Sequence, residues 1–265
     1  MEFDQEMSRK IEALYVTPEV VEQRRLVREA LRLRDGERVL DVGSGPGLLA
    51  AELADAVGRE GRVSGIDLSA AMVEMARTRC AARPWAEFRT GDAMKLPFAD
   101  EWFDAAVSTQ VFEYLPDIAG ALAELHRVVR PGGRIALLDT DYGSLIIHTE
   151  DQPRMARVLA AWDEHFVHGS LPRTLSRQLR EAGFRVRHRS AIPMFNPEFR
   201  DNTYGKLLLA MMASFAGGRR GVSHAEAESW FMEFAALDAE DRFFFSLNRY
   251  LFVAERGAGP CPART

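Results

Sequence analysis

The feature that most constrains how this chain can fold is a run of small residues, Gly43-Ser44-Gly45-Pro46-Gly47. It follows a strand-like segment, residues 38–42, and precedes a helical pattern over residues 48–57. Small residues at a strand-to-helix turn allow a sharp change of direction and let a ligand approach the backbone closely. The pattern predicts an α/β unit whose first turn holds a nucleotide-like ligand. A glycine-rich turn without a ligand is the alternative interpretation.

Strand-like and helix-like segments then alternate, which is typical of a parallel sheet with crossover helices. We expect further strands at residues 62–66, 87–90, 103–110 and 134–139, and helices at residues 70–82 and 117–130. The second of these helices has apolar residues at helical spacing, a capping residue in Asp117 and a stop at Pro131-Gly132-Gly133. The alternation predicts one sheet with the carboxyl ends of its parallel strands at one edge.

The regular alternation of strand-like and helix-like segments ends after Asp139. We expect a long helical region, a strand and a final strand at residues 152–182, 184–192 and 244–255. Between the two strands, Ser223 and Glu226 form a capping box at the start of a helix. We divide the chain into an N-terminal helical lid (1–34), a ligand-binding core (35–192), a helical insert that forms a second lid (193–241), the final core strand (242–256) and a flexible tail (257–265).

Two acidic residues follow successive strands. Asp67 ends the second strand, where a carboxylate can accept hydrogen bonds from ribose hydroxyls, and Asp92 follows the third, where it can hold an adenine amino group. Together they favour an adenosine-containing ligand. Each alone has a structural alternative, since Asp67 also precedes Ser69, a candidate helix cap.

With these residues in place, the chain resembles the class I S-adenosylmethionine (SAM)-dependent methyltransferases, most closely the ubiquinone/menaquinone-biosynthesis-like (type 11) small-molecule branch. The matching stretches follow the family's order and spacing: residues 39–47, 65–69, 91–98 and 127–134. The resemblance is strong over residues 35–140 and weak over residues 184–255. It implies an α/β fold with a doubly wound, mostly parallel, seven-stranded Rossmann-like sheet, an antiparallel last strand and helical lid segments at both ends.

The resemblance also implies SAM as cofactor and a set of cofactor-binding positions. These are Tyr15, Gly43, Ser44, Gly45, Gly47, Asp67, Leu68, Met72, Asp92, Ala93 and Gln110. In this reading the glycines pass under the methionine part, and Asp67 holds both ribose hydroxyls. Gln110 borders the sulfonium.

The adenine is the part of SAM for which the resemblance implies the most contacts. Leu68 and Met72 would flank it, and Asp92 and Ala93 would meet its amino edge. Tyr15 would reach the methionine carboxylate through its hydroxyl. Its alternative role is that of a hydrophobic anchor for the N-terminal helix.

Methyl transfer needs the nucleophile, methyl carbon and sulfur in line, and a general base helps when the acceptor loses a proton. We predict Asp141 and His148 as this base, because a loop over residues 139–148 leaves the sheet at its ligand edge. The other candidates are Glu113, Tyr114, Tyr142, His165 and His168. A solvated or packing role is the alternative for each histidine and for Asp141.

Large apolar side chains in the insert predict the class of acceptor. Phe195, residues 207–215 and residues 230–234 can line a pocket for a small, largely apolar or aromatic metabolite, as in quinone-like or secondary metabolism. The same residues can instead form a homodimer face. A net charge of -5 argues against nucleic acid as partner.

The cysteine content and the hydropathy of the sequence exclude several other kinds of protein. Cys80 and Cys261 are the only cysteines in the sequence, which supports neither a disulfide framework nor a metal site and argues against arsenite methylation. The charged N-terminus lacks a signal-peptide pattern, and the longest apolar run, residues 207–215, is about half of the roughly 20 residues of a membrane span. We expect a cytoplasmic protein.

Two other functions share parts of this pattern. An NAD(P)-dependent oxidoreductase would have a third small residue where Leu48 stands, and it has no counterpart of Asp92. A non-catalytic protein that binds SAM or another small molecule would keep the same cofactor residues. Only a turnover assay separates that binder from an enzyme.

Overall fold

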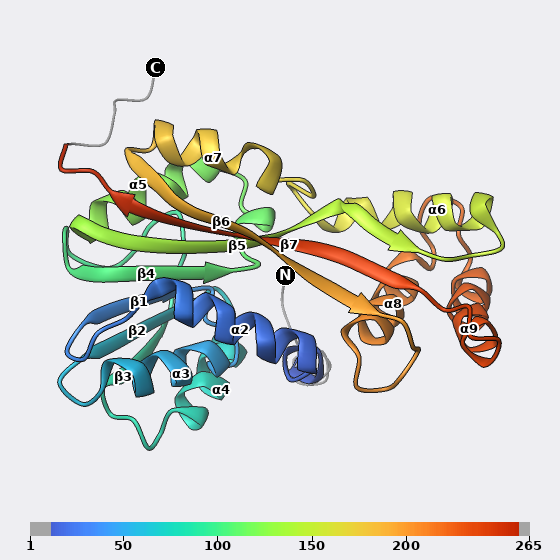
Figure 1. Ribbon diagram of the computed structural model, residues 1–265, viewed down its shortest axis with the longest axis horizontal. Helices are drawn as coiled ribbons and strands as arrows, with labels where there is room; N and C mark the ends of the chain where they lie inside the picture. Colours follow the sequence, from blue (N-terminus) through green and yellow to red (C-terminus); the bar gives the residue numbers. More distant parts are fainter. Residues whose placement is uncertain (1–11, 260–265) are drawn as a thin grey trace.

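The structure is a computed structural model, and it describes residues 12–259 of the 265. Residues 1–11 of the predicted N-terminal lid and residues 260–265 of the predicted tail, including Cys261, lie outside the described residues. The architecture is a central sheet with helices on both faces (Figure 1). No helix in the described part of the chain is long and apolar enough to span a membrane.

Seven strands form the sheet in the order β3-β2-β1-β4-β5-β7-β6. They are β1 (Arg38–Val42), β2 (Arg62–Asp67), β3 (Ala86–Thr90), β4 (Phe103–Thr109), β5 (Val129–Ile147), β6 (Phe184–Asn196) and β7 (Phe245–Arg256). The first five strands pair in parallel, and β7 lies antiparallel between β5 and β6. The predicted mostly parallel sheet with an antiparallel last strand is confirmed.

The helices divide between the two faces of the sheet. They are α2 (Pro18–Leu31), α3 (Leu48–Val57), α4 (Ala70–Arg79), α5 (Ile118–Val128), α6 (Gln152–Trp162), α7 (Pro172–Glu181), α8 (Tyr204–Ala216) and α9 (His224–Ala239), with short 3₁₀ helices η1 (Phe112–Tyr114) and η2 (Asp163–His165). Helices α2, α3 and α4 cover one face, and α5 and α7 cover the other (Figure 1).

Side-chain alternation along the strands explains the two layers. In β1, Val39 packs into the core on the α3 side, while Leu40 packs into the core on the α5 side. Successive residues of a strand point to opposite faces, so a strand buried on both faces is apolar throughout. This is why four successive residues of β1, Val39 to Val42, are all buried.

One predicted loop is a strand. The segment 139–148 was expected to leave the sheet, but β5 continues to Ile147, which pairs with Phe245 of β7. The pairing slips between Asp141 and Ile146, and there the Ser144 hydroxyl accepts a hydrogen bond from the Asn248 amide at 2.9 Å. The partner strand lies about a hundred residues later in sequence. Local composition, with Gly143 and Ser144, therefore indicates a loop where a distant pairing makes a bulged strand.

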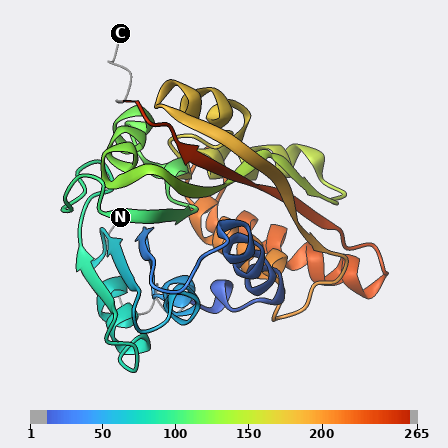
Figure 2. The same ribbon diagram turned by 60° about the vertical axis from the view of Figure 1, so that its left-hand side comes forward.

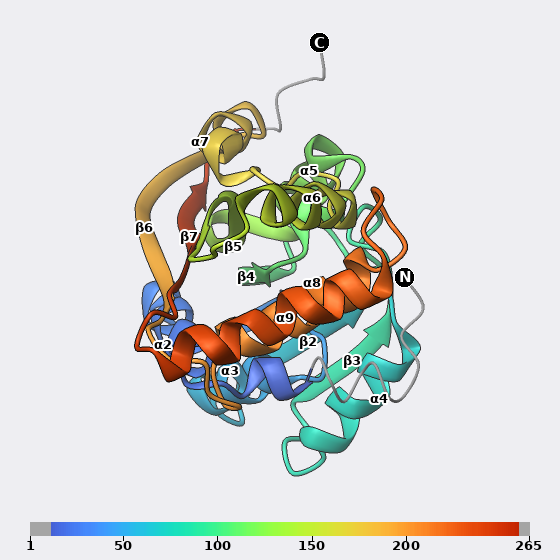
Figure 3. The ribbon, with the colours of Figure 1, turned by 90° about the vertical axis from the view of Figure 1, so that its right-hand side faces the viewer.

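The long strands β5, β6 and β7 carry an arm beyond the parallel half of the sheet (Figure 1). Helices α6, α8 and α9 gather at this end (Figure 3). The insert begins as strand up to Asn196 and then forms α8 and α9. The predicted cap at Ser223 is confirmed, since its Oγ accepts from the Glu226 amide at 3.1 Å.

Helix α2 joins the arm to the rest of the molecule. It lies against the long strands and contacts α8 (Figure 2). Its Glu19 carboxylate accepts hydrogen bonds from the Asn196 side chain and, at 3.3 Å, from the Tyr204 amide. The N-terminal segment and the insert, which are about 180 residues apart in sequence, are therefore directly bonded.

Candidate functional site

The glycine-rich turn connects β1 to α3 and is tied to β2 by its backbone. The amides of Gly43 and Ser44 both donate to the Ile66 carbonyl oxygen at 2.8 Å. Gly43, Gly45 and Gly47 have φ angles of 70°, 52° and 79°. Residues with a Cβ rarely adopt these angles, so the turn itself requires glycine at these positions.

The three glycines differ in what surrounds them. A Cβ at Gly43 would overlap Val111 Cγ2, and one at Gly47 would lie 2.8 Å from the backbone of α4. A Cβ at Gly45 would have Tyr15 Cε2, at 3.8 Å, as its neighbour. Gly43 and Gly47 are therefore needed for packing, whereas Gly45 leaves space at the carboxyl edge of the sheet, where α/β sheets bind ligands.

Asp67 links the turn to the end of β2. Its Oδ2 accepts from the Gly45 amide at 2.9 Å, and its Oδ1 accepts from the Ser69 amide at 2.8 Å. Burial raises the pKa of Asp67, and the two amide bonds oppose this rise. Each carboxylate oxygen has a second lone pair, so Asp67 can hold the turn and still accept from hydroxyl groups.

The positions expected around an adenine differ strongly in exposure. Leu68 is 71% exposed, an unusual exposure for a leucine, while Met72 and Ala93 are buried. Asp92 Oδ1 accepts from the Met94 amide at 2.8 Å, which closes the turn after β3. Asp67, Leu68 and Asp92 follow neighbouring strands, so they share the carboxyl edge of the sheet.

Tyr15 lies over the glycine turn. Its ring faces the open side of Gly45, where a Cβ would lie 3.8 Å from Tyr15 Cε2, and its carbonyl oxygen accepts from Arg24 Nη1 at 2.5 Å. Burial raises the pKa of Tyr15 to about 12, with a further contribution from the charge of Asp67. Tyr15 is therefore both a packing residue and a neighbour of the turn, and the structure is compatible with either predicted role.

Gln110 and Glu113 meet at Thr140, beside the carboxyl ends of β4 and β5. Gln110 has a φ of 57°, and its Nε2 donates to Thr140 Oγ1 at 3.4 Å. Glu113 is fully buried, and its Oε2 accepts from the Thr140 amide at 2.9 Å. Its Oε1 has no hydrogen-bond partner within residues 12–259. A non-glycine residue at positive φ next to a buried acid is a feature typical of functional sites.

Burial raises the pKa of Glu113 to about 7, which the Thr140 amide and the charge of Arg249 partly oppose. Asp139 lies beside it, and its Oδ1 accepts from the Glu113 amide at 3.2 Å. Burial and then the Glu113 charge raise the pKa of Asp139. Each acid keeps one buried oxygen, Glu113 Oε1 and Asp139 Oδ2, without a hydrogen-bond partner among the described residues, and Asp139 also holds the turn through the Glu113 amide.

Several predicted catalytic candidates surround Glu113. The hydroxyl groups of Tyr114 and Tyr142 lie close enough to its carboxylate to lower its pKa by hydrogen bonding. The amide of His168 donates to the Glu113 carbonyl oxygen at 2.9 Å. His165 stacks on Trp162 with ring centroids 4.6 Å apart, and burial lowers the pKa of His165 to about 4.

Asp141 and His148, the predicted base, are not brought together. Asp141 Oδ2 accepts from Arg173 Nε at 2.8 Å, and its Oδ1 accepts from the Gly143 amide. The His148 amide donates to the Phe244 carbonyl at the end of the arm. Asp141 is paired with Asn248, whereas His148 is bonded to Phe244, four residues away from Asn248. Four strand residues correspond to about 13 Å between the two positions.

A buried polar group that the sequence analysis missed lies next to Glu113. Arg249 of β7 has 0% exposure, donates through Nη1 to the Gln23 side chain, and has its guanidinium carbon 4.5 Å from the ring centre of Tyr204. The sequence contains a clue to it. Leu247 and Leu251 occupy inward positions of an alternating strand, and Arg249 is a charge at the inward position between them.

Two further polar atoms at the glycine turn are buried. Asp41 Oδ2 and Ser44 Oγ have no hydrogen-bond partner in the described part of the chain. Burial raises the pKa of Asp41 to about 7, with an added contribution from Asp67. Buried polar atoms without partners are rare in folded proteins, so a polar ligand at this turn would satisfy them.

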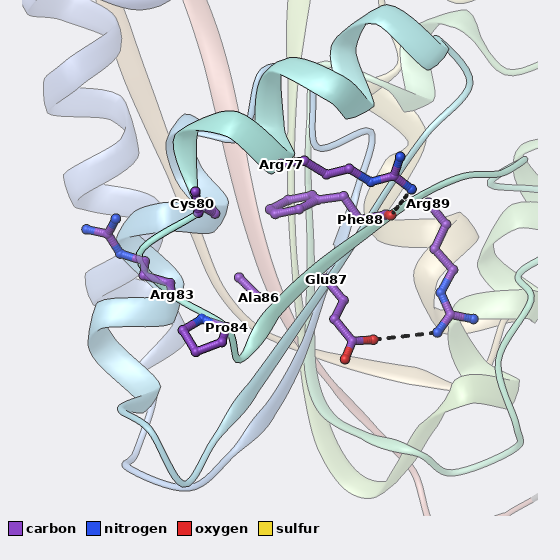
Figure 4. A pocket seen from close by; sticks show the side chains of 9 residues that line it. Arg77, Cys80, Arg83, Pro84, Ala86, Glu87, Phe88 and Arg89 are labelled. Atoms are coloured by element: carbon purple, nitrogen blue, oxygen red, sulfur yellow. Dashed lines mark hydrogen bonds and ion pairs between the residues drawn. The ribbon is translucent and has the colours of Figure 1, made fainter.

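A surface pocket lies elsewhere, on the outer edge of the sheet between α4 and β3 (Figure 4). Arg77, Arg83 and Arg89 line it, and each is bonded to a neighbouring acid: Glu74, Asp55 and Glu87. No predicted site residue contributes to this pocket. Within residues 12–259, no three His, Cys, Asp or Glu side chains are grouped so that they could hold a metal ion.

Comparison with known proteins identifies a domain. Residues 40–137 match the family model described as a methyltransferase domain. An uncharacterized 37.1 kDa protein in transposon TN4556 of Streptomyces fradiae is 35% identical over 233 residues, covering 86% of this chain and 65% of that protein. A demethylmenaquinone methyltransferase of Desulfitobacterium hafniense is 38% identical over 114 residues, covering 42% of this chain and 45% of the relative.

The 2-phytyl-1,4-naphtoquinone methyltransferase of Synechococcus elongatus is 42% identical over 109 residues, covering 40% of this chain and 47% of that one. The chain thus spans less than two thirds of each of these relatives. Among solved structures, a methyltransferase-like protein of Bacillus halodurans superposes with a TM-score of 0.65 at 20% identity, covering 89% of this chain and all of the other. The [4+2]-cyclase SpnF superposes with a TM-score of 0.59 at 22% identity, covering 91% and 82%. These two structures establish the fold.

Proposed function

We propose that this chain, whose residues 40–137 form a class I SAM-dependent methyltransferase domain of the type 11 branch, transfers a methyl group from SAM to a small, largely apolar or aromatic metabolite. The observation that carries the proposal is the bond between the Gly45 amide and Asp67 Oδ2. It joins the open glycine turn to an acid at the end of the next strand. Two of the relatives are named for quinone substrates, which supports a quinone-like acceptor.

The residues at the turn fit SAM. Gly45 leaves room beside its Cα, and the buried oxygens of Asp41 and Ser44 need polar partners. Asp67 and Asp92 would hold the ribose and the adenine amino group, and Tyr15 would cover the methionine end. When bound, SAM supplies a methyl group on a sulfonium, which is a good leaving group.

The protein's part in the reaction is orientation, exclusion of water and acceptance of a proton. Gln110 and Thr140 fix the carboxyl ends of β4 and β5, beside which we place the acceptor. For the proton acceptor, Asp141 and His148 remain candidates. We favour Glu113, because it is fully buried, has one oxygen free and is bonded to Thr140, whereas Asp141 is already paired with Arg173.

Calorimetric titration with S-adenosylhomocysteine tests the cofactor proposal. Asp67→Ala should weaken binding by about 10- to 100-fold, which corresponds to about 1.5–3 kcal/mol for hydrogen bonds to a charged group. Asp55→Ala is the matched control, because Asp55 is an exposed acid paired with Arg83 on the outer side of the sheet. Tight binding of NADH with no response to S-adenosylhomocysteine would refute the proposal.

Turnover is a separate measurement. Labelled SAM incubated with the protein and a cell extract should yield a labelled small molecule, whose mass identifies the acceptor. Binding of S-adenosylhomocysteine without any methylated product from extracts or candidate quinones would indicate a binding protein instead of an enzyme.

A further inference from the structure

Arg249 stands out among the buried arginines. Arg24, Arg249 and Arg256 are each less than 9% exposed. Arg24 is paired with Glu52 at 2.9 Å, and Arg256 is paired with Glu101 at 3.1 Å. Arg249, the most deeply buried of the three, has no acidic partner at ion-pair distance in the described part of the chain; its Nη1 donates to the neutral side chain of Gln23, and it interacts with the hydroxyl of Tyr204.

The unused donors of Arg249 lie on one edge of its guanidinium. Its Nε and Nη2 have no hydrogen-bond partner among residues 12–259. These two nitrogens direct parallel N–H bonds to the same side, which is the geometry that binds a carboxylate with two hydrogen bonds. A buried cation with unpaired donors is costly to the fold, so such an edge is expected to have an anionic partner.

The position of Arg249 indicates where that partner comes from. It is paired with Thr140 on β5, and Thr140 in turn contacts both Gln110 and Glu113. The glycine turn follows β1, which is separated from β7 by β4 and β5. Arg249 therefore lies on the β5–β7 side of the site, from which its charge still reaches Tyr15, the residue over the turn.

The surroundings of Arg249 suit an acid with an apolar body. The ring of Tyr204 lies beside the guanidinium. Burial raises the pKa values of Tyr114 and Tyr142, and the charge of Arg249 opposes this rise, which places those two side chains near it. The charge of Arg249 acts on Glu113, but Glu113 Oε1 has no hydrogen-bond partner in the described part of the chain. A ligand that combines a planar ring or chain with a carboxylate would match both the rings and the cation.

We propose that the Nε–Nη2 edge of Arg249 binds a carboxylate of the methyl acceptor, so that the acceptor is an apolar or aromatic acid. This inference rests on the proposed function. The carboxylate of the cofactor's methionine part is the other source of the same chemistry, and the experiment below separates the two sources.

Fluorine NMR with two isosteric fragments tests the acceptor side, using protein saturated with S-adenosylhomocysteine. We expect 4-fluorobenzoate to bind the wild-type protein at least 10-fold more tightly than neutral 4-fluorobenzamide. Arg249→Met should abolish this preference. Arg249→Lys should retain only part of it, because lysine keeps the charge but lacks the paired donors. Arg130→Met, which removes an exposed arginine paired with Asp104, is the control and should change nothing.

Calorimetry tests the cofactor side with S-adenosylhomocysteine and 5′-methylthioadenosine, which lacks the carboxylate. If the Nε–Nη2 edge of Arg249 binds the acceptor, Arg249→Met leaves the affinities for both nucleosides unchanged. A loss of at least 10-fold for S-adenosylhomocysteine alone would overturn the acceptor assignment and place the cofactor carboxylate on Arg249.

Equal binding of benzoate and benzamide to the wild-type protein would also overturn the acceptor assignment. If Arg249→Met does not fold, as judged by circular dichroism, Arg249→Lys provides the comparison. Failure of the wild-type protein to bind S-adenosylhomocysteine would refute the proposed function. The fragment comparison can then be made on the protein without nucleoside, so the two failures are distinguishable.

Discussion

At the scale of single residues, the site is built around ionisable groups that burial keeps from water. Glu113 is the one closest to the proposed chemistry, since it shares Thr140 with Gln110. Burial raises its pKa to about 7, which suits a group that must accept a proton near neutral pH. Asp139 supports it by accepting from the Glu113 amide through Oδ1.

We expect Glu113→Gln to lower kcat by about 10²- to 10⁴-fold, because the amide keeps the shape of the side chain but cannot accept a proton. The affinity for S-adenosylhomocysteine should not change. Asp141→Asn and His148→Ala are the comparison variants in the same assay with the true acceptor. Full activity of Glu113→Gln, together with loss of activity in either comparison variant, would return the base to the sequence-predicted residues.

Asp41 provides a test of burial without any substrate. Its pKa rises from an ordinary value near 3.8 to about 7 in the folded protein, chiefly through burial. The folded state therefore binds this proton more tightly than the unfolded chain. The corresponding stability is complete below about pH 4 and is lost as the pH rises to about 7.

Asp41→Asn remains neutral and should keep this stability. Without cofactor, the variant should gain about 2–3 kcal/mol on the wild-type protein between pH 5 and pH 8. Urea denaturation at the two pH values measures the difference. A constant difference between the two proteins would show that Asp41 ionises freely in the fold.

Single residues also mark the limit of what the sequence can predict about the site. Gly43, Gly45 and Gly47 were predictable because a sharp strand-to-helix turn needs them locally, and Asp67 follows from its place at a strand end. Arg249 was missed because its importance depends on which side chains face it, and Gln23 and Tyr204 come from opposite ends of the chain.

At the scale of secondary-structure elements, local signals predicted most boundaries and distant pairing changed the rest. The strand at Arg38–Val42 and the helix at Leu48–Val57 have the predicted bounds, since a glycine turn separates them. β5 is longer than predicted because its outer half finds a partner in β7. Strand formation depends on such partners more than helix formation does. The helical region expected over residues 152–182 is also divided, into α6 and α7 with η2 and a loop between them.

The bonds from Glu19 to Asn196 and Tyr204 couple two elements that we propose as the moving cover of the site. Methyl transfer excludes water, so the cover must open to admit ligands and close over them. We expect S-adenosylhomocysteine to slow hydrogen exchange by at least several-fold in residues 12–20 and 193–241. Mass spectrometry of peptides from these segments gives the measurement.

Glu19→Ala should weaken this protection in both segments at once, because it removes the bonds that join them. Glu29→Ala is the matched control on the same helix, since Glu29 is an exposed acid paired with Arg25. Unchanged exchange in both segments of the wild-type protein on addition of the nucleoside would contradict the lid proposal.

At the scale of the whole molecule, the parallel half and the arm share one continuous core. The apolar cluster on the α2–α3–α4 face includes Val39 and Leu53 of the parallel half as well as Leu208 and Trp230 of the arm. The three long strands pass through both parts. The boundaries predicted between core and lids are therefore boundaries along the sequence. The apolar core itself is continuous across them.

We expect thermal unfolding without ligand to occur in one cooperative transition, since neither part can lose its core without exposing the other. Differential scanning calorimetry should show a calorimetric enthalpy close to the van't Hoff enthalpy. A separate early transition that disappears in a variant with a destabilised α9, such as Trp230→Ala, would show instead that the arm melts alone.

The course of β5 also bears on how such a protein can diversify. One strand carries Thr140, beside the proposed reaction centre, and ends at Ile147 in the arm, with the bulge after Asp141 between them. Bulges absorb inserted residues without shifting the register of the flanking ladder. We therefore expect descendants of this chain to acquire new acceptors by substitution and insertion outward of the bulge. The half of β5 that ends at Asp141 can stay unaltered, while the half beyond the bulge changes with the acceptor.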